Sequence, residues 1–265
     1  MVRSAPDGSI NRDFYERELD EELRLYDASN PVCRYYHVSR KQHVESVCRA
    51  LLSARTGPRI AADIGCGTGS YFPSLAPVAS QLFGVEYAES KAHVARRRVA
   101  VQNTAMIVGS ATEIPIATST CHLVLCSEVI EHFPNPDDVL TELLRITAPG
   151  GQVVISTPVR YDPATWWRAL TGCRNRASRR LQSPDEHGHY WYFAPEDLEK
   201  RLKAIGAVVI SFAVVPRIHF PGLPRLIRYR LASPKLLMFL GRRLPLAGPF
   251  GDIGAFGILV VNKLP

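Results

Sequence analysis

The sequence contains no run of about 18 uncharged apolar residues, so we expect no membrane-spanning helix. Its first residues are polar and acidic, without the apolar segment that marks a secretory signal. The six cysteines form no CxxC pair and no metal-like cluster, which indicates reduced thiols. These absences together predict a cytoplasmic protein.

Nothing in the composition divides the 265 residues into separate units. The chain has no internal repeat, no low-complexity stretch and no linker rich in Gly, Ser or Pro. We therefore expect a single domain over 1–265, and its hydrophobic content of 46% suffices for a normal core. Within this domain we expect N-terminal helices over 1–55, a cofactor-binding core over 56–158, and cap or substrate insertions at 159–194 and 216–253.

Short apolar runs alternate with helical patterns along the chain. The runs RIAADIG at 59–65, QLFGVEYA at 81–88 and CHLVLCSEV at 121–129 have the length and content of buried strands. Segments such as PDDVLTELLRIT, which follows the third of these runs, have helical spacing. The alternation predicts an α/β fold, a doubly wound and mostly parallel sheet with helices on both faces.

A glycine-rich turn follows the first of these strands. In DIGCGTG, Asp63 precedes Gly65, Gly67 and Gly69. Such a turn lets a ligand approach the main chain, and the helix N-terminus that follows favours negative charge. Glu86 ends the next strand, where a carboxylate can accept hydrogen bonds from both hydroxyls of a ribose. With VGSATEIP at the end of a third strand, the pattern predicts a nucleoside site at the carboxyl edge of the sheet.

Four segments resemble, in order, the motifs of class I S-adenosylmethionine-dependent methyltransferases: DIGCGTG, Glu86, SATEIP, and the long stretch LVLCSEVIEHFPNPDDVLTELLRITAPGGQVVIST. The resemblance covers about residues 40–215. It implies a Rossmann-like sheet of seven strands with a reversed final strand, which GAFGILVVN near the C-terminus could supply. It also implies S-adenosyl-L-methionine as cofactor.

The resemblance carries over to cofactor-binding residues. Asp63, Gly65 and Gly67 would hold the methionine portion, Glu86 the ribose, and Ser127 would lie beside the methionine end. Because Ser110 stands where the family often has Asp, the adenine would contact the backbone of the two residues that follow. The expected set is Asp63, Gly65, Cys66, Gly67, Gly69, Glu86, Tyr87, Ala111, Thr112 and Ser127, with Tyr36 and Arg40 closing over the cofactor.

A nicotinamide-dependent oxidoreductase is the rival from another class. Its GxGxxG fingerprint would place a glycine or alanine at position 70, where this chain has Ser70. The fingerprint also lacks an acid such as Asp63 two residues before the first glycine. A binder of the cofactor without catalytic activity is a further alternative.

The segment SEVIEHF carries the candidate catalytic residues. Glu128, Glu131 and His132 would share one face of a helical turn, and DEHGHYWYF adds His187 and His189. Carboxylates and imidazoles together could bind a divalent metal, Mg²⁺ if oxygen ligands dominate, through Glu128, Glu131, His132 and His189. Alternatively, His132 is a general base, or Glu131 and His132 only cap the helix and pack under the cofactor.

Two subfamilies share these residues. Ubiquinone-biosynthesis O-methyltransferases are similar in EVIEH and in a later His-aromatic-PEDL segment, whereas small-RNA 2′-O-methyltransferases share E-x-x-E-H with a downstream His and use metal. The net charge of +7 would suit RNA, but the basic patches are poor in the aromatic platforms that bind nucleic acid. We therefore expect O-methylation of a small-molecule, lipid-linked or glycan hydroxyl, with metal-dependent RNA 2′-O-methylation as the alternative. The expected acceptor-contacting residues are Trp166, His187, His189 and Trp191.

A late basic segment, 217–243, interleaves arginines with leucines and aromatic residues. This composition is typical of an element at an anionic membrane surface, or of a lid over an apolar substrate. The protein would then be peripheral to the membrane. Alternatively, these leucines pack on the sheet.

Overall fold

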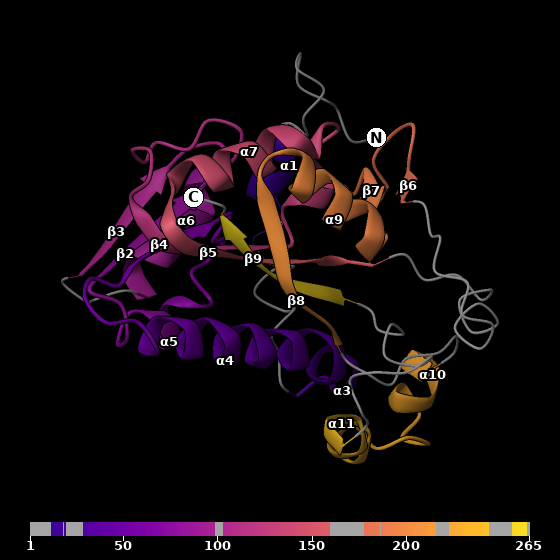
Figure 1. The fold of residues 1–265 in the computed structure, drawn as a ribbon. Coiled ribbons are helices and arrows are strands. Elements are labelled where there is room, and N and C mark those ends of the chain that lie inside the picture. Colours follow the sequence, from indigo (N-terminus) through magenta and orange to yellow (C-terminus); the bar gives the residue numbers. More distant parts are fainter. Residues whose placement is uncertain are drawn as a thin grey trace.

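The computed structural model describes residues 12–17, 19, 29–98, 103–159, 178–185, 187–215, 223–243 and 256–263. At its centre is a seven-stranded sheet in the order β3-β2-β1-β4-β5-β9-β8 (Figure 1). The strands are β1 (Ile60–Ile64), β2 (Gln81–Glu86), β3 (Thr104–Val108), β4 (Cys121–Ser127), β5 (Thr147–Pro158), β8 (Ala207–Val215) and β9 (Phe256–Lys263).

The directions of the strands confirm the predicted fold class. β1 to β5 pair in parallel, and β9 lies antiparallel between β5 and β8. The FGILVVN part of the predicted segment therefore supplies the reversed strand. The strand order changes direction between β1 and β4, which is the place where ligands bind in sheets of this kind.

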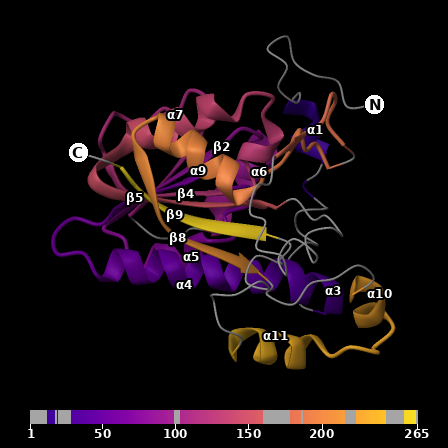
Figure 2. The same cartoon turned by 45° about the vertical axis from the view of Figure 1, so that its right-hand side comes forward.

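Helices cover both faces of the sheet. On one side lie α4 (Ser39–Ser53) and α5 (Phe72–Leu75), and on the other lie α7 (Pro136–Ile146) and α9 (Pro195–Ala204), as both views show (Figure 2). The remaining elements are α1 (Arg12–Arg17), α3 (Pro31–Cys33), the π-helix η1 (Arg34–Val38), α6 (Glu89–Arg98), the 3₁₀ helix η2 (Ile130–His132), β6 (Arg179–Arg180), β7 (Trp191–Tyr192), α10 (Leu223–Arg228) and α11 (Pro234–Arg243).

The sequence of α7 explains why it forms and how it packs. Pro136 begins the helix, two aspartates occupy its first turn, and Arg145 lies in its last turn, an arrangement that suits the helix dipole. Its apolar residues fall on one face and are buried against β4 and β5: Val139, Leu140, Leu143, Leu144 and Ile146. Arg201 of α9 binds Asp137 at 2.8 Å and so ties the two outer helices together.

The structure describes only some residues of the two segments that the sequence predicts as insertions. Most of 159–194 lies outside the described residues, including Trp166, so its expected role in the acceptor pocket stays a prediction. In 216–253, the described residues form α10 and α11. No described helix has both the length and the apolar content needed to cross a bilayer.

Candidate active site

The glycine turn after β1 adopts a backbone that requires glycine. Gly65, Gly67 and Gly69 have φ values of +68°, +52° and +74°, in the left-handed region that other residues rarely adopt. At Gly65 space is also restricted, because a Cβ atom there would lie 2.3 Å from Cγ2 of Val129. The turn is anchored to β2, since the N–H groups of Gly65 and Cys66 both donate to the Val85 carbonyl.

Glu86, at the end of β2, holds the same turn in place through hydrogen bonds. Its Oε2 accepts the Gly67 N–H at 2.8 Å and its Oε1 accepts the Ala88 N–H at 2.8 Å. An ionised carboxylate oxygen can accept more than one hydrogen bond, so a carboxylate at this place suits the hydroxyl groups of a ribose. Asp63 is buried at the end of β1, paired alongside Gly84 of β2. This edge, with two buried acids beside a glycine-rich turn, fits the ribose and carboxylate of a nucleoside-containing cofactor.

The other expected cofactor residues surround this edge. The loop with Ala111 and Thr112 is joined to β2 by the Gly109 N–H, which donates to the Glu86 carbonyl, and Ser110 binds Thr112 within the loop. The Cys66 side chain points into the core toward Met106 rather than into the turn.

Tyr71 is a site residue that the sequence did not indicate. Its hydroxyl lies 3.0 Å from Oγ of Ser127, the last residue of β4. It follows the glycine turn directly and its ring is buried. It therefore links the turn after β1 to the end of β4, and only the folded arrangement could reveal this contact.

Helix α1 also lies at the site, which the sequence did not predict. The Tyr15 ring meets the Tyr87 ring at 6.3 Å and the His132 ring at 5.8 Å between centroids, both edge-on. The Arg12 guanidinium lies over the Tyr87 ring, and the Glu16 carboxylate accepts the first N–H groups of α6. Helix α1 therefore spans from the Glu86 side of the site to the His132 side.

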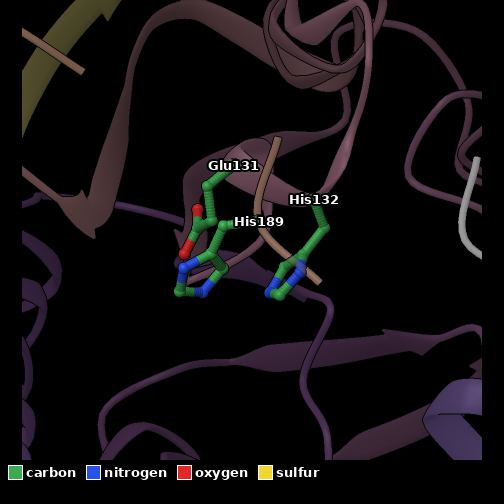
Figure 3. A group of neighbouring side chains, drawn as sticks. All are labelled: Glu131, His132 and His189. Atoms are coloured by element: carbon green, nitrogen blue, oxygen red, sulfur yellow. The ribbon is translucent and has the colours of Figure 1, made fainter. Parts of the chain in front are cut away.

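Glu131, His132 and His189 form a compact cluster (Figure 3). One oxygen or nitrogen from each lies within 4.8 Å of the others, and the three side chains point to the same side. The Tyr190 N–H donates to the Glu131 carbonyl, which draws the segment carrying His189 against η2. Nδ1 of His132 lies 3.2 Å from the Gly188 carbonyl, so Nδ1 carries the proton and Nε2 keeps a lone pair.

Burial determines the protonation of this cluster. It raises the pKa of the Glu131 carboxyl well above its usual range, and the neighbouring Glu128 adds to that effect. Burial and the nearby His189 lower the pKa of His132 to about 3, and burial also lowers the pKa of His189. Oε2 of Glu131 accepts the Thr157 hydroxyl, whereas Oε1 is buried and has no hydrogen-bond partner among the described residues.

The cluster therefore has the composition of a metal site. Two neutral imidazoles offer lone pairs beside a buried carboxylate oxygen, and a cation would compensate for the desolvation of Glu131. The Asp185 carboxylate lies 3.7 Å from Nδ1 of His189, beyond hydrogen-bonding distance, and it accepts the main-chain N–H groups of His187 and His189. These residues fit a divalent ion with a preference for nitrogen.

Glu128 corrects one expectation. It does not share a helical face with Glu131 and His132, because η2 begins only at Ile130 and Glu128 has a left-handed φ of +59°. Its carboxylate turns instead to Arg40 at 2.8 Å and to the Ser156 hydroxyl at 2.8 Å. Burial raises the pKa of Glu128 more than Arg40 lowers it.

Four other expected site residues lie beside the site or away from it. Arg40 is buried, binds Glu128 and stacks over the Phe256 ring, and Tyr36 packs edge-on against Tyr35. The exposed His187 is outside the cluster. Trp191 stacks on Phe193 and donates its N–H to the Pro134 carbonyl, and its expected contact with the acceptor stays a prediction.

Comparisons with known proteins agree with this fold. Residues 62–155 match a family model described as a methyltransferase domain. An uncharacterized methyltransferase of Mycobacterium leprae (strain Br4923) is 31% identical over 176 residues, 65% of this chain and 65% of that protein. A ubiquinone biosynthesis O-methyltransferase of Aeromonas salmonicida (strain A449) is 28% identical over 150 residues, 56% of this chain and 62% of that protein. The chain thus aligns with less than two thirds of the length of these relatives.

Solved structures show the same fold at low identity. Magnesium protoporphyrin IX methyltransferase from Synechocystis PCC 6803, with bound SAH, has a TM-score of 0.63 at 16% identity, covering 95% of this chain and 97% of that one. The fold, the glycine turn and the ordered motifs are those of class I S-adenosylmethionine-dependent methyltransferases. The segment with the motifs, residues 62–155, belongs to the methyltransferase domain family.

Proposed function

We propose that the protein transfers the methyl group of S-adenosylmethionine to the hydroxyl oxygen of a small-molecule, lipid-linked or glycan acceptor. The observation that carries this proposal is the position of Tyr15. Its ring contacts Tyr87 beside Glu86 and also His132, so one side chain joins the cofactor edge to the ionisable cluster. An acceptor bound between them would lie close both to the cofactor and to the ionisable cluster.

The cofactor would be held by the glycine turn, Asp63 and Glu86, with the loop of Ala111 and Thr112 beside the adenine. When bound, it supplies a sulfonium methyl group that an oxygen nucleophile can attack. The residues of the chain must then orient the acceptor and accept its proton. His132 is available for this role, because Nδ1 donates to the Gly188 carbonyl and Nε2 keeps its lone pair. Its lowered pKa makes it a weak base, which favours an acceptor hydroxyl that is itself acidic or that is bound to a cation.

A metal ion is the second element of the proposal. Two of the three donors in the cluster are imidazole nitrogens, so Mn²⁺, Co²⁺ or Zn²⁺ would suit Glu131, His132 and His189 better than Mg²⁺, which favours oxygen. A cation supplies a lower pKa for a coordinated hydroxyl. Then His132 and Glu131 would both act as ligands, and the acceptor proton would leave to solvent.

An RNA acceptor is the second candidate. It is supported by the same cluster, since an E-x-x-E-H segment with a later histidine is the pattern shared with RNA 2′-O-methyltransferases. A lipid-linked or glycan acceptor is favoured because the described basic surface is interleaved mainly with leucines, whereas RNA-binding surfaces usually present aromatic platforms.

A calorimetric titration with S-adenosylhomocysteine tests the cofactor assignment, with NAD as the competing ligand. Glu86→Gln should weaken binding by about tenfold, because an amide can accept only one of the two main-chain N–H groups and leaves the other unsatisfied. Glu113→Gln, on the exposed side of the neighbouring loop, is the matched control and should bind as the wild type does. Binding of NAD, or equal affinity in both variants, would contradict the assignment.

The metal element is tested by titrating the same protein with MnCl₂ and following the Mn²⁺ signal by electron paramagnetic resonance. His189→Ala should abolish binding, whereas His187→Ala, at the exposed neighbouring histidine, should retain it. Binding that survives in His189→Ala would remove the metal proposal and leave His132 as the base.

A further inference from the structure

Helices α10 and α11 form a projecting pair on the side of the molecule that carries α4 (Figure 2). Helix α10 contacts α3, and α11 contacts η1. The inner side of the pair is anchored, because Ile227 is fully buried and Ala232 and Leu237 pack against the same apolar cluster. The pair is therefore part of the folded body.

The outer side of this pair carries an unusual amount of exposed apolar surface. Seven large hydrophobic residues are exposed in the described chain, and five of them belong to this pair: Tyr229 (71%), Leu231 (75%), Leu236 (55%), Phe239 (50%) and Leu240 (44%). We call these five residues the apolar tip. The remaining two, Val208 and Ile210, lie on β8. Single exposed apolar residues are normal, whereas such a concentration marks a contact surface.

The helical phase of α11 leads to the same conclusion. Leu236 and Leu240, four residues apart, face outward, while Leu237 faces the core. A surface helix ordinarily places polar residues on its outer side. Because α11 is apolar on both sides, its outer side is suited to an environment other than water.

The turn between the two helices is held in a defined shape. Arg230 has a left-handed φ of +60°, and the Arg230 and Leu231 N–H groups donate to the carbonyls of Ile227 and Leu226. This closes α10 with paired hydrogen bonds of the Schellman type. Tyr229 and Leu231 are consequently presented at a fixed position rather than on a loose loop.

Positive charge surrounds the apolar tip. Arg225, Arg228, Arg230 and Lys235 are all exposed, and 223–243 contains no acidic residue. Among the residues that the structure describes, none of these four cations has an ion-pair partner. A complementary surface must therefore be both anionic and able to accept leucine side chains.

We propose that the apolar tip and its four cations dock on an anionic lipid bilayer, with the leucines at the level of the headgroups. A second copy of the chain fits less well, because a symmetric contact would bring these cations together. RNA fits less well, because three of the five residues of the apolar tip are leucines, which do not stack on bases. Docking would bring η1 and the Arg40–Glu128 pair at the end of β4 close to the bilayer, a consequence for catalysis that rests on the proposed function.

The test is flotation of the full-length protein with vesicles of phosphatidylcholine, with or without phosphatidylglycerol. We expect binding only to the anionic vesicles. The double variant Leu231→Gln/Leu240→Gln should bind at least about tenfold more weakly, because less apolar surface is removed from water. Arg228→Gln and Lys235→Gln should each weaken binding by about fivefold, the effect of one cation near an anionic surface.

Ile210→Gln is the matched control, since it replaces a comparably exposed apolar residue on β8, and it should bind as the wild type does. Equal binding to neutral vesicles, equal loss in Ile210→Gln, displacement by RNA, or self-association in place of vesicle binding would each overturn the proposal. S-adenosylhomocysteine affinity, measured without vesicles on the wild type and the same variants, separates the two proposals. A wild type that binds vesicles but does not bind S-adenosylhomocysteine would contradict the methyltransferase activity and leave the docking proposal intact.

Discussion

The two halves of the candidate site are built by different means. At the glycine turn the working groups are main-chain N–H groups, placed by three left-handed glycines and held by Glu86. At the end of β4 they are ionisable side chains brought out of water: Arg40, Glu128, Glu131, His132 and His189. The turn therefore depends on backbone conformation and the end of β4 on charge balance, and the two should fail under different perturbations.

The largest expected effect is loss of the Arg40 charge. Arg40→Met should lower the free energy of unfolding by about 3–5 kcal/mol, because it leaves the partly buried Glu128 without its cation. The double variant Arg40→Met/Glu128→Gln should recover most of this loss, as measured by urea unfolding. Lys41→Met is the control at the next residue: its pair with Glu45 is partly exposed and should contribute less than about 1 kcal/mol.

If the double variant is as unstable as Arg40→Met, charge balance is not what holds the end of β4. Stability there would depend instead on packing of the guanidinium over the Phe256 ring. The contrast between the two halves of the site would then disappear, since both would depend on steric packing.

The second expected effect concerns the turn. Gly65→Ala should destabilise the fold by about 2–4 kcal/mol, the sum of a left-handed alanine and an overpacked contact with Val129. Gly150→Ala has the same φ of +68° but no atom within 4 Å of the added Cβ, so it should cost only about 1–2 kcal/mol. Unfolding curves of the two variants separate backbone strain from crowding, and equal losses would show that Val129 gives way.

The local sequence pattern was sufficient to predict much of the fold and the half of the site that the glycine turn forms. Runs such as 59–65 and 81–88 are short, apolar and bounded by turn residues, so their strands and the parallel sheet follow from the sequence. The tight turn was predictable from its glycines, because only glycine adopts these φ values readily. Glu86 followed from its place at the end of the next strand.

The β4 half could be predicted only in part. The pairing of Glu131 and His132 with His189 followed from residue type, and the structure brings the three together. The direction of Glu128 did not follow, because a single left-handed φ turns it toward Arg40. Contacts of Tyr15 and Tyr71 join segments that are distant in sequence, and no local pattern encodes such contacts.

The smallest expected effect is a change in the pH dependence of stability near η1. Burial, followed by the charges of Arg40 and His187, lowers the pKa of His37 to about 4 from its ordinary value of 6.5. Between these values the unfolded chain binds a proton at His37 that the folded chain does not, so His37 makes the free energy of unfolding fall as the pH falls from 6.5 to 4. Glu131, whose pKa is raised by burial, acts in the opposite direction, since its protonation favours the folded state. The pH dependence of the free energy of unfolding of the whole protein therefore contains contributions of both signs, and a comparison of the wild type with a variant isolates the contribution of one residue.

His37→Gln should make the decrease in the free energy of unfolding on acidification shallower, as measured by urea unfolding across this pH range. The exposed His93→Gln on α6 should leave the slope unchanged. An unchanged slope in His37→Gln would mean that water reaches the ring, and the charge-sensitive region would then end at Arg40 rather than extend into η1.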